Sequence, residues 1–388
     1  MHARTRLRRT ALLAVLLLAA ASGRAVLGAG QPAGPAADVI KRVQDRFAPD
    51  LRLAVFDVKA EPKGGALELS GEVDRVAARD AVLQALRDAG RTNLIDRIVV
   101  LPDPQFAARP LGVVTVSVAV MKTKASHESE LASQLLMGMV VRVLKKDRWY
   151  YVQSVDDRYL GWMEADHLAM MSRQQVDALE RAPRLVVTSP FAWVRMQAHA
   201  DALPVCDLVV GDVLQAAGPG GDFLPVQLPD GRTGYVSRGD VADHAAWTAS
   251  RAATPDAVEQ TARTFMGVPY LWGGTSVKGF DCSGFVQMVF RLNGVALPRD
   301  ADQQADEGEA VRVDDTLAHL KQGDVLFFGP RPGVTSITHT GIYLGGQLFI
   351  HCAGLVKLNS FDPASPLYSD NLLKRLVKAR RMSFRPGV

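Results

Sequence analysis

The sequence predicts a multidomain α+β protein in which a small α+β unit and two small β-barrels precede a larger domain of helices and antiparallel strands. Three observations lead to this fold class. The chain has 388 residues, and a domain commonly takes roughly 100–200 residues. Two successive segments repeat one pattern of strands and glycines, which indicates a duplicated unit. The last third places helical patterns before apolar strand patterns, as α+β domains do.

Residues 1–28 have the features of a secretory signal peptide. Four arginines and no acid precede the wholly apolar run Ala11–Ala21, and small residues follow it. A basic start, a short apolar core and small residues at the cut are typical of such peptides. The run is shorter than the roughly 20 residues that span a bilayer. We therefore expect export to the periplasm with no membrane span after cleavage; an uncleaved anchor is the alternative.

Removal of this leader brings the chain close to neutrality. The whole chain has 45 Lys+Arg against 41 Asp+Glu, and the leader holds five arginines, which leaves 40 basic residues. A nucleic-acid partner would call for a basic face, so none is expected. We also expect a monomer without a cofactor.

Residues 36–101 predict the small α+β unit. LRLAVFDV and ALELSGEV alternate between apolar and polar residues, Arg75–Ala89 has apolar residues at helical spacing, and IDRIVV closes the segment. Alternation is typical of strands. GQPAGPAAD before this unit and LPDPQFAARP after it are predicted to be a tether and a linker. No group of polar residues here suggests chemistry, so we expect a docking or shielding domain.

Residues 111–171 and 184–243 are predicted to be the two barrels. Gly138 and Gly161 of the first segment have the same separation as Gly211 and Gly234 of the second. Short alternating strands joined by Gly/Asp turns indicate small β-barrels. Both segments resemble the bacterial SH3-like barrels that accompany cell-wall hydrolases. The second lacks tryptophan at the two matching positions, which makes a wall-binding role for it doubtful.

Residues 255–388 are predicted to form the α+β domain, after a second linker, HAAWTASRAATPD. Ala257–Met266 and Cys282–Leu292 have helical patterns. The strand patterns that follow are DVLFFG, HTGIYLG, QLFIHCA and RLVKARR.

The motif FDCSGF places Cys282 in the first turn of the second of these helices. The chain has three cysteines, so at least one is unpaired within the chain. Unpaired N–H groups and the macrodipole at a helix start favour an anion, which predicts a thiolate nucleophile. Gly284 leaves room for a neighbouring strand to approach. A buried apolar cysteine is the alternative. A disulfide between Cys206 and Cys352 also stays open.

Two histidines are candidates for the base and the orienting group that a cysteine peptidase needs; for either residue taken singly, a histidine of the core is the alternative. His339 begins HTGIYLG and His351 lies in QLFIHCA, with a tight turn between them. Antiparallel strands joined by such a hairpin can set both rings side by side. There is no HExxH, no CxxC and no acidic cluster beside these residues, so no metal is expected.

The run YLWGGTSVKGFDCSGF, followed by HTGIYLG and FIHCA, resembles the NlpC family of papain-like cell-wall cysteine peptidases. The resemblance implies that Cys282 is the nucleophile, His339 the base and His351 the third, orienting residue. It also implies that Tyr270 helps to form the oxyanion hole, and a phenol beside the Cys282 N–H suits that role physically.

The order of domains, with HESELASQLLMG in the first barrel, resembles the γ-D-glutamyl-L-diamino acid endopeptidases, or dipeptidyl-peptidases VI. The resemblance implies cleavage of peptidoglycan stem peptides, L-Ala-γ-D-Glu-diamino acid, that have a free L-alanine amine. It further implies five substrate-binding residues: Asp281, Ser283, Trp272, Tyr159 and Glu130.

Several alternatives remain from the sequence. Asp281 can be a helix cap alone, Glu130 and Tyr159 can be surface residues, and Tyr150 or Tyr151 can replace Tyr159. A broader hydrolase that cuts intact wall peptides, or a non-catalytic wall-binding module, would also explain parts of the pattern. The diamino acid, lysine or meso-diaminopimelate, stays open.

Overall fold

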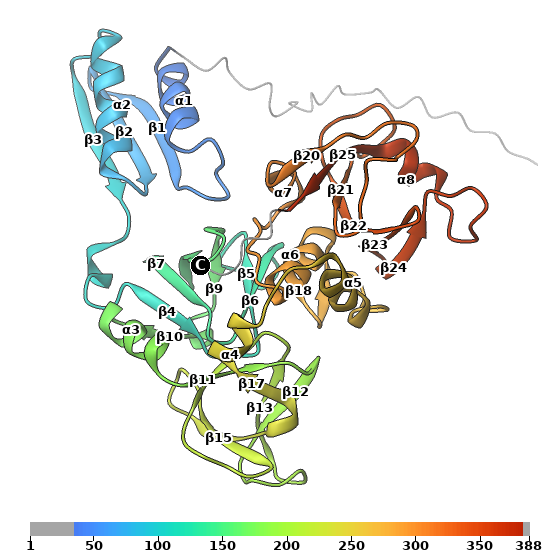
Figure 1. Cartoon of the computed structure of the whole chain (residues 1–388). Helices are drawn as coiled ribbons and strands as arrows, with labels where there is room; N and C mark the ends of the chain where they lie inside the picture. The colour runs from blue at the N-terminus through green and yellow to red at the C-terminus, as the bar shows by residue number, and fades with distance from the viewer. Residues whose placement is uncertain (1–34, 383–388) are drawn as a thin grey trace, which may run out of the picture.

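The computed structural model describes residues 35–382, so the expected signal peptide lies outside the described residues. The multidomain α+β fold class is confirmed. Figure 1 shows the first barrel at the centre, with the N-terminal unit, the second barrel and the last unit arranged around it. Within residues 35–382, none of the helices has the length and apolar character needed to cross a membrane.

The N-terminal unit is a three-stranded sheet packed against two helices. Strand β2 pairs antiparallel with β1 and parallel with β3. The parallel pair needs a crossover, which α2 supplies. Apolar residues of both helices meet the sheet in one core that includes Val43, Leu69 and Val82. The elements are α1 (Pro35–Phe47), β1 (Phe56–Lys63), β2 (Ala66–Val73), α2 (Val76–Asp88) and β3 (Leu94–Val100).

The two barrels have the same strand order. The first runs β10-β4-β7-β8-β9-β5-β6, and the second runs β17-β11-β14-β15-β16-β12-β13 when it is written in the same direction. This shared topology supports the duplication that the glycine spacing predicts. The first barrel comprises β4 (Leu111–Val114), β5 (Val118–Lys122), β6 (Leu131–Leu136), β7 (Val140–Lys146), β8 (Tyr150–Ser154), β9 (Leu160–Met163) and β10 (Leu168–Met171). The second comprises β11 (Arg184–Val187), β12 (Phe191–Arg195), β13 (Pro204–Val209), β14 (Val213–Ala216), β15 (Phe223–Gln227), β16 (Thr233–Ser237) and β17 (Val241–Asp243).

The last unit packs a buried helix, α6 (Cys282–Leu292), against a six-stranded antiparallel sheet of order β20-β25-β21-β22-β23-β24. Helix α6 is apolar almost all round, and nine of its residues are buried, as expected of a helix inside a core. The other elements are α5 (Pro255–Thr264), β18 (Thr275–Ser276), β19 (Gly279–Phe280), α7 (Ala301–Gln304), β20 (Glu309–Val311), β21 (Val325–Phe328), β22 (His339–Gly345), β23 (Leu348–Ala353), β24 (Leu355–Ser360), α8 (Asp370–Arg375) and β25 (Leu376–Arg381).

Three local predictions are wrong. The expected tether enters helix α1, which begins at Pro35 because proline suits the first turn of a helix. The first strand starts only at Phe56, since residues 51–54 form a turn. Neither expected linker is free of structure: Leu101 and Phe106 of the first are buried, and the second contains α4 (His244–Ala249), capped by Asp243. Helix α3 (Arg173–Arg181) connects the barrels.

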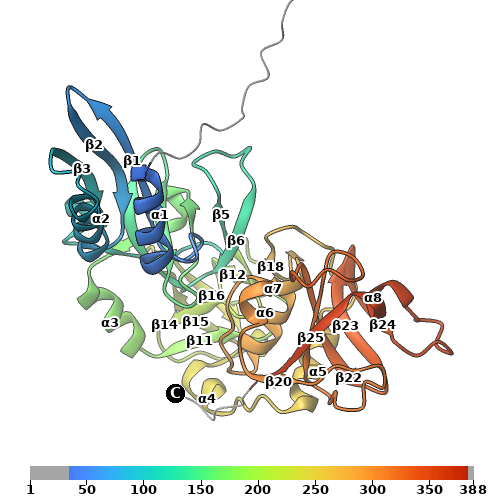
Figure 2. The same cartoon turned by 90° about the horizontal axis from the view of Figure 1, so that it is seen from above.

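The first barrel is built into the last unit. Gln134 of β6 accepts hydrogen bonds from the Thr275 N–H at 2.9 Å and the Ser276 hydroxyl at 3.0 Å. Gly273 has a φ of +79°, and a Cβ there would lie 2.4 Å from the Leu131 carbonyl oxygen. Figure 2 shows β5 and β6 extending along the last unit beside β18. The loop before Cys282 therefore lies directly on the first barrel.

Candidate active site

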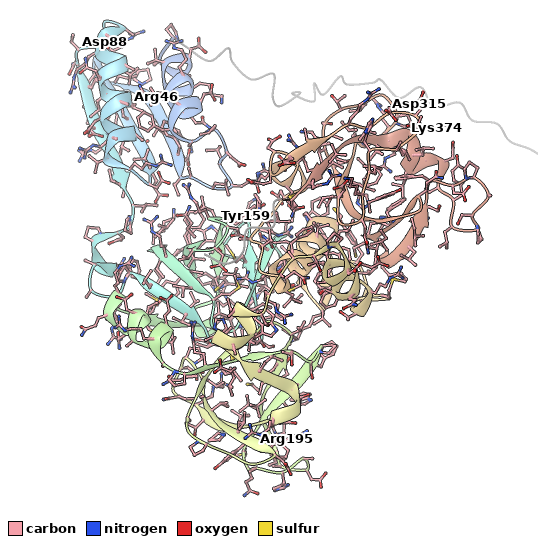
Figure 3. The ribbon with its side chains drawn as sticks, in the orientation of Figure 1. Arg46, Asp88, Tyr159, Arg195, Asp315 and Lys374 are labelled. Carbon is pink, nitrogen blue, oxygen red and sulfur yellow. The ribbon has the colours of Figure 1, made fainter. Side chains whose placement is uncertain are left out.

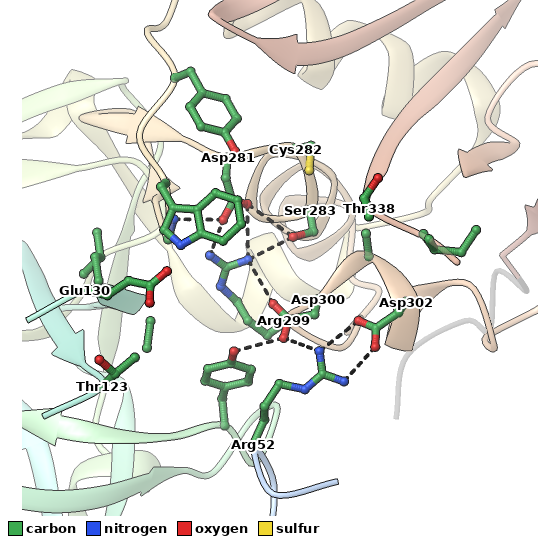
Figure 4. Close-up of a pocket in the computed structure, with 18 residues that line it drawn as sticks. Arg52, Thr123, Glu130, Asp281, Cys282, Ser283, Arg299, Asp300, Asp302 and Thr338 are labelled. Carbon is green, nitrogen blue, oxygen red and sulfur yellow. Dashed lines mark hydrogen bonds and ion pairs between the residues drawn. The ribbon is translucent and has the colours of Figure 1, made fainter. Parts of the chain in front are cut away.

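A cleft of about 360 Å³ opens beside the start of helix α6. Three units form its walls: Arg52 from the N-terminal unit, Glu130 and Tyr159 from the first barrel, and residues of the last unit. Of the nine residues that the sequence assigns to the site, seven line this cleft: Tyr270, Trp272, Asp281, Cys282, Ser283, Tyr159 and Glu130. Figure 4 shows Glu130 and Arg52 on the side opposite Cys282, and the Tyr159 hydroxyl meets the same Asp300 oxygen as Arg52; we call that side the closed end.

Cys282 is the first residue of α6, as predicted, and its side chain is 8% exposed. Asp281 caps the helix by accepting the Gly284 N–H at 2.7 Å. A Cβ on Gly284 would lie 2.1 Å from the Gly274 carbonyl oxygen. The close approach predicted at Gly284 is therefore real, although the partner is the YLWGG loop and not a strand. These contacts fix where the thiol points.

The two predicted histidines lie on adjacent strands, β22 and β23, and touch. His339 Nε2 and His351 Nδ1 are 2.7 Å apart. His351 is buried and packs 5.3 Å from the Phe349 ring, centroid to centroid. Thr338, next to His339, lines the cleft, and the Thr340 backbone on its other side acts to lower the pKa of Cys282. Strand β22 thus brings the His339 position beside the thiol.

Asn359 of β24 extends this pair and fixes its protons. Its amide nitrogen donates to the Leu367 carbonyl at 3.0 Å, so its Oδ1 faces His351 Nε2 at 2.8 Å and accepts a hydrogen bond from Nε2–H. His351 Nδ1 then carries no proton, and it accepts a hydrogen bond from His339 Nε2–H. The remaining nitrogen of His339, Nδ1, is left with the lone pair that a general base needs.

Burial opposes the resting thiolate that the helix start predicts. Burial raises the pKa of Cys282 to about 12, and the charge of Asp281 acts in the same direction. Burial and the neighbouring His351 lower the pKa of His339 to about 3. Desolvation here outweighs the helix macrodipole. Both shifts favour a neutral thiol and a neutral imidazole before substrate binds.

Tyr270 stands on the loop that packs against α6. Burial, followed by the charge of a Cys282 thiolate, raises the pKa of Tyr270. Its phenol is therefore kept protonated, as a hydrogen-bond donor must be. The backbone N–H of Tyr270 donates to the Gly354 carbonyl at 2.9 Å, which ties the loop to the turn after β23.

Asp281 has two structural partners besides the helix. Arg299, 1% exposed, donates to Asp281 Oδ2 at 2.6 Å and to the Ser283 hydroxyl at 3.0 Å. The Gly273 N–H donates to the same carboxylate at 3.0 Å. The cap interpretation of Asp281 is thus confirmed, and the residue also lines the cleft. A buried carboxylate and guanidinium in contact satisfy each other.

Tyr159, and neither of the two alternative tyrosines, reaches the cleft. Its hydroxyl donates to Asp300 Oδ2 at 2.9 Å. Tyr151 packs on Trp162, with ring centroids 5.0 Å apart, and Tyr150 packs edge-on against Phe106. Burial raises the pKa of Asp300, against the lowering effect of the nearby arginines.

Glu130 and Trp272 complete the walls. Glu130 is exposed at the cleft, and within residues 35–382 its carboxylate has neither a hydrogen-bond donor nor an ion-pair partner. Trp272 is 62% exposed although it is a large apolar ring. A free carboxylate and an open aromatic face beside a nucleophile are groups suited to contact a ligand.

Sequence reasoning missed Arg299, Asp300, Asn359 and Arg52. Arg299 and Asp300 stand in the run LPRDAD, where two adjacent opposite charges follow a proline, and Asn359 stands in a strand of otherwise ordinary polarity. Only the adjacent pair of opposite charges after the proline offered a signal. All three cysteines are free in the structure, so the open question of a Cys206–Cys352 disulfide is answered for this state.

We expect Asn359→Ala to lower kcat by tenfold or more, because the proton arrangement of the two histidines is no longer fixed; a wrong tautomer alone costs up to about 10⁴ in kcat. Asn359→Asp tests the position independently. A carboxylate there stabilises imidazolium, so the pKa values of the histidines rise and the acid limb of kcat/KM moves to higher pH. Asn371→Ala on exposed α8 is the control. If the acid limb of kcat/KM does not move in Asn359→Asp, the hydrogen-bonded chain from Asn359 through His351 to His339 does not control the base.

Two segments of the chain match known protein families. Residues 267–381 match the NlpC/P60 family, and residues 122–168 match the bacterial dipeptidyl-peptidase Sh3 domain. Dipeptidyl-peptidase 6 of Lysinibacillus sphaericus is 29% identical over 273 residues, which cover 67% of this chain and 95% of that protein. Gamma-D-glutamyl-L-lysine dipeptidyl-peptidase of Bacillus subtilis is 47% identical over 98 residues, 25% of this chain and 32% of that protein.

A solved structure shares most of the fold. The crystal structure of an NlpC/P60 family protein from Bacillus cereus has a TM-score of 0.58 at 25% identity, over 70% of this chain and 99% of that one. Fold and site together define the class: this chain is a cysteine peptidase. Within that class, its last unit is an NlpC/P60 domain and its first barrel is a bacterial dipeptidyl-peptidase Sh3 domain. The resemblance to the NlpC family is confirmed.

Proposed function

We propose that this cysteine peptidase hydrolyses the γ-D-glutamyl–diamino acid bond of peptidoglycan stem peptides whose L-alanine has a free amine. One observation carries the proposal: the cleft beside Cys282 ends in the unpaired carboxylate of Glu130, next to Tyr159. An ammonium group inside a cleft needs anions and hydrogen-bond acceptors to replace its water. Two relatives are named dipeptidyl-peptidases, and these names support the same reaction.

The catalytic steps follow from the arrangement of the residues. Cys282 sulfur attacks the γ-carbonyl of D-glutamate while its proton passes to His339 Nδ1. The N–H of Cys282 and the Tyr270 phenol stabilise the developing oxyanion. The tetrahedral intermediate expels the amine of the diamino acid, which takes the proton from His339. Water then attacks the thioester with His339 again acting as base, and the L-Ala-D-Glu dipeptide leaves.

Different residues of the cleft bind different groups of the substrate. Glu130 and Tyr159 bind the alanine ammonium at the closed end, with Asp281 adding negative potential. Ser283, held by Arg299, binds the α-carboxylate of D-glutamate, and its arginine neighbour supplies positive charge. Trp272 covers the substrate from the solvent side. The leader predicted from the sequence supports action in the periplasm, in turnover or recycling of the wall. The proposed enzyme works there as a monomer.

The test compares L-Ala-γ-D-Glu-diaminopimelate with its N-acetyl form, in one buffer. Acetylation removes the ammonium and adds bulk at the closed end. Losing a charged hydrogen-bond partner costs about 1.5–3 kcal/mol, so kcat/KM is expected to fall at least tenfold. Glu130→Gln is expected to weaken the free-amine substrate selectively. Equal kcat/KM for the two peptides contradicts the proposal and favours a broader wall hydrolase.

A further inference from the structure

Arg52 belongs to the N-terminal unit and lines the cleft. It lies in the turn between α1 and β1, and its guanidinium crosses to the segment that starts helix α7 (Figure 4). Nη1 is 2.8 Å from Asp300 Oδ2, and Nη2 is 2.7 Å from Asp302 Oδ2. Asp50 of the same turn accepts from Nε at 2.9 Å. A domain that the sequence suggested only for docking or shielding therefore supplies part of the active-site wall.

The guanidinium is fully occupied by these carboxylates. Contacts run from Nε to both oxygens of Asp50, from Nη1 to Asp300 and Asp302, and from Nη2 to Asp50 and Asp302. These use every direction in which an arginine donates. Arg52 therefore binds no substrate group directly. Its charge instead holds together carboxylates that would otherwise repel one another across the joint between two units.

The backbone around Arg52 is fixed to the first barrel. The Leu160 N–H donates to the Arg52 carbonyl at 2.8 Å, and the Gln153 side-chain amide donates to the Leu53 carbonyl at 2.7 Å. Leu160 directly follows Tyr159, whose hydroxyl meets the same Asp300 oxygen as Arg52. Val55 packs with Leu160 in a small apolar cluster. One residue thus joins three units around the position of Tyr159.

We propose that Arg52 is a positioning residue that holds the closed end of the cleft shut and thereby sets how much substrate fits beyond the alanine amine. The N-terminal unit is then part of the specificity site. Without the guanidinium, Asp50, Asp300 and Asp302 repel, the segment 300–302 separates from the turn, and Tyr159 loses its fixed partner. The inference rests on the proposed function, because the closed end has meaning only for a substrate that is read from its amine.

The experiment uses the full chain with Arg52→Met, Arg52→Lys and the control Arg46→Ala. Arg46 lies on α1, away from the cleft (Figure 3). For the free-amine tripeptide, we expect Arg52→Met to raise KM by about tenfold or more, as for loss of a charged hydrogen-bonding group, with a smaller change in kcat. The ratio of kcat/KM between the free and N-acetyl peptides should fall by a similar factor. Arg52→Lys should recover part of both, because it restores charge without the fork.

Two readouts separate the possible failures. If the wild type discriminates between the two peptides and Arg52→Met discriminates equally, the positioning role of Arg52 is overturned while the proposed function stands. If the wild type does not discriminate, the proposed function fails, and with it the role of Arg52 in specificity. Hydrogen exchange of residues 299–304 tests the positioning role of Arg52 without any substrate. Faster exchange in Arg52→Met than in Arg46→Ala supports this role, and identical exchange in the two variants overturns it.

Discussion

Cys282→Ala and His339→Ala are each expected to lower kcat by about 10³-fold or more while leaving the fold intact. Loss of a nucleophile, or of the base that takes its proton, has an effect of that order in enzymes that use both as a unit. Cys282 is the group at the cleft that can form a thioester, and His339 is the base whose Nδ1 is left free by its neighbours. The double variant should be little worse than either single variant, since neither residue works without the other.

Cys206→Ala is the matched control for the thiol. Cys206 lies in the second barrel on β13, and burial raises its pKa to about 11. Its removal should leave turnover unchanged. Circular dichroism of every variant confirms folding. Near-wild-type turnover by folded Cys282→Ala protein would contradict covalent catalysis at this position.

The fold was predictable where a repeated or periodic pattern carries it. Gly138 and Gly211 both adopt left-handed φ values, +87° and +92°, which explains why glycine marks the same turn in each barrel. Helix α6 was predictable because a capping acid precedes an apolar run. Helix α1 was missed because it begins inside a Pro/Gly-rich stretch that also suits a tether, and only packing against the sheet decides between them.

The placement of the proposed catalytic residues was predictable because a hairpin and a helix start position them by local geometry. His339 and His351 need only the turn between β22 and β23. The residues that were missed act over long sequence separations. Arg52 lies 248 positions from Asp300, and such a contact depends on how whole units dock. The burial that opposes the predicted thiolate was missed for a similar reason: the helix start is local, whereas the burial comes from the assembled core.

Arg299→Met is expected to reduce the free energy of unfolding by about 3–5 kcal/mol, the usual cost of removing one partner from a buried ion pair. Arg299 is 1% exposed and lies 2.6 Å from Asp281. Methionine keeps much of the volume, so the loss reports on charge and hydrogen bonding more than on packing. It leaves the Asp281 carboxylate with hydrogen-bond donors from Gly273, Gly284 and Ser283 but without its counter-charge, and the Ser283 hydroxyl loses the Arg299 donor. Chemical denaturation of the full chain measures the change.

A second substitution separates the charge from the hydrogen-bond network. Arg299→Met combined with Asp281→Asn removes both charges, so it should be more stable than Arg299→Met alone, because an unpaired buried charge costs more than a missing pair. Arg312→Met is the control, since Arg312 is exposed and, among residues 35–382, forms its ion pair with Asp314 at the surface. Activity should stay low in both Arg299 variants, because Ser283 and Asp281 lose the donor that sets their positions. Wild-type stability in Arg299→Met would mean that the pair is dispensable, and that Asp281 is held by the Gly273 and Gly284 N–H groups alone.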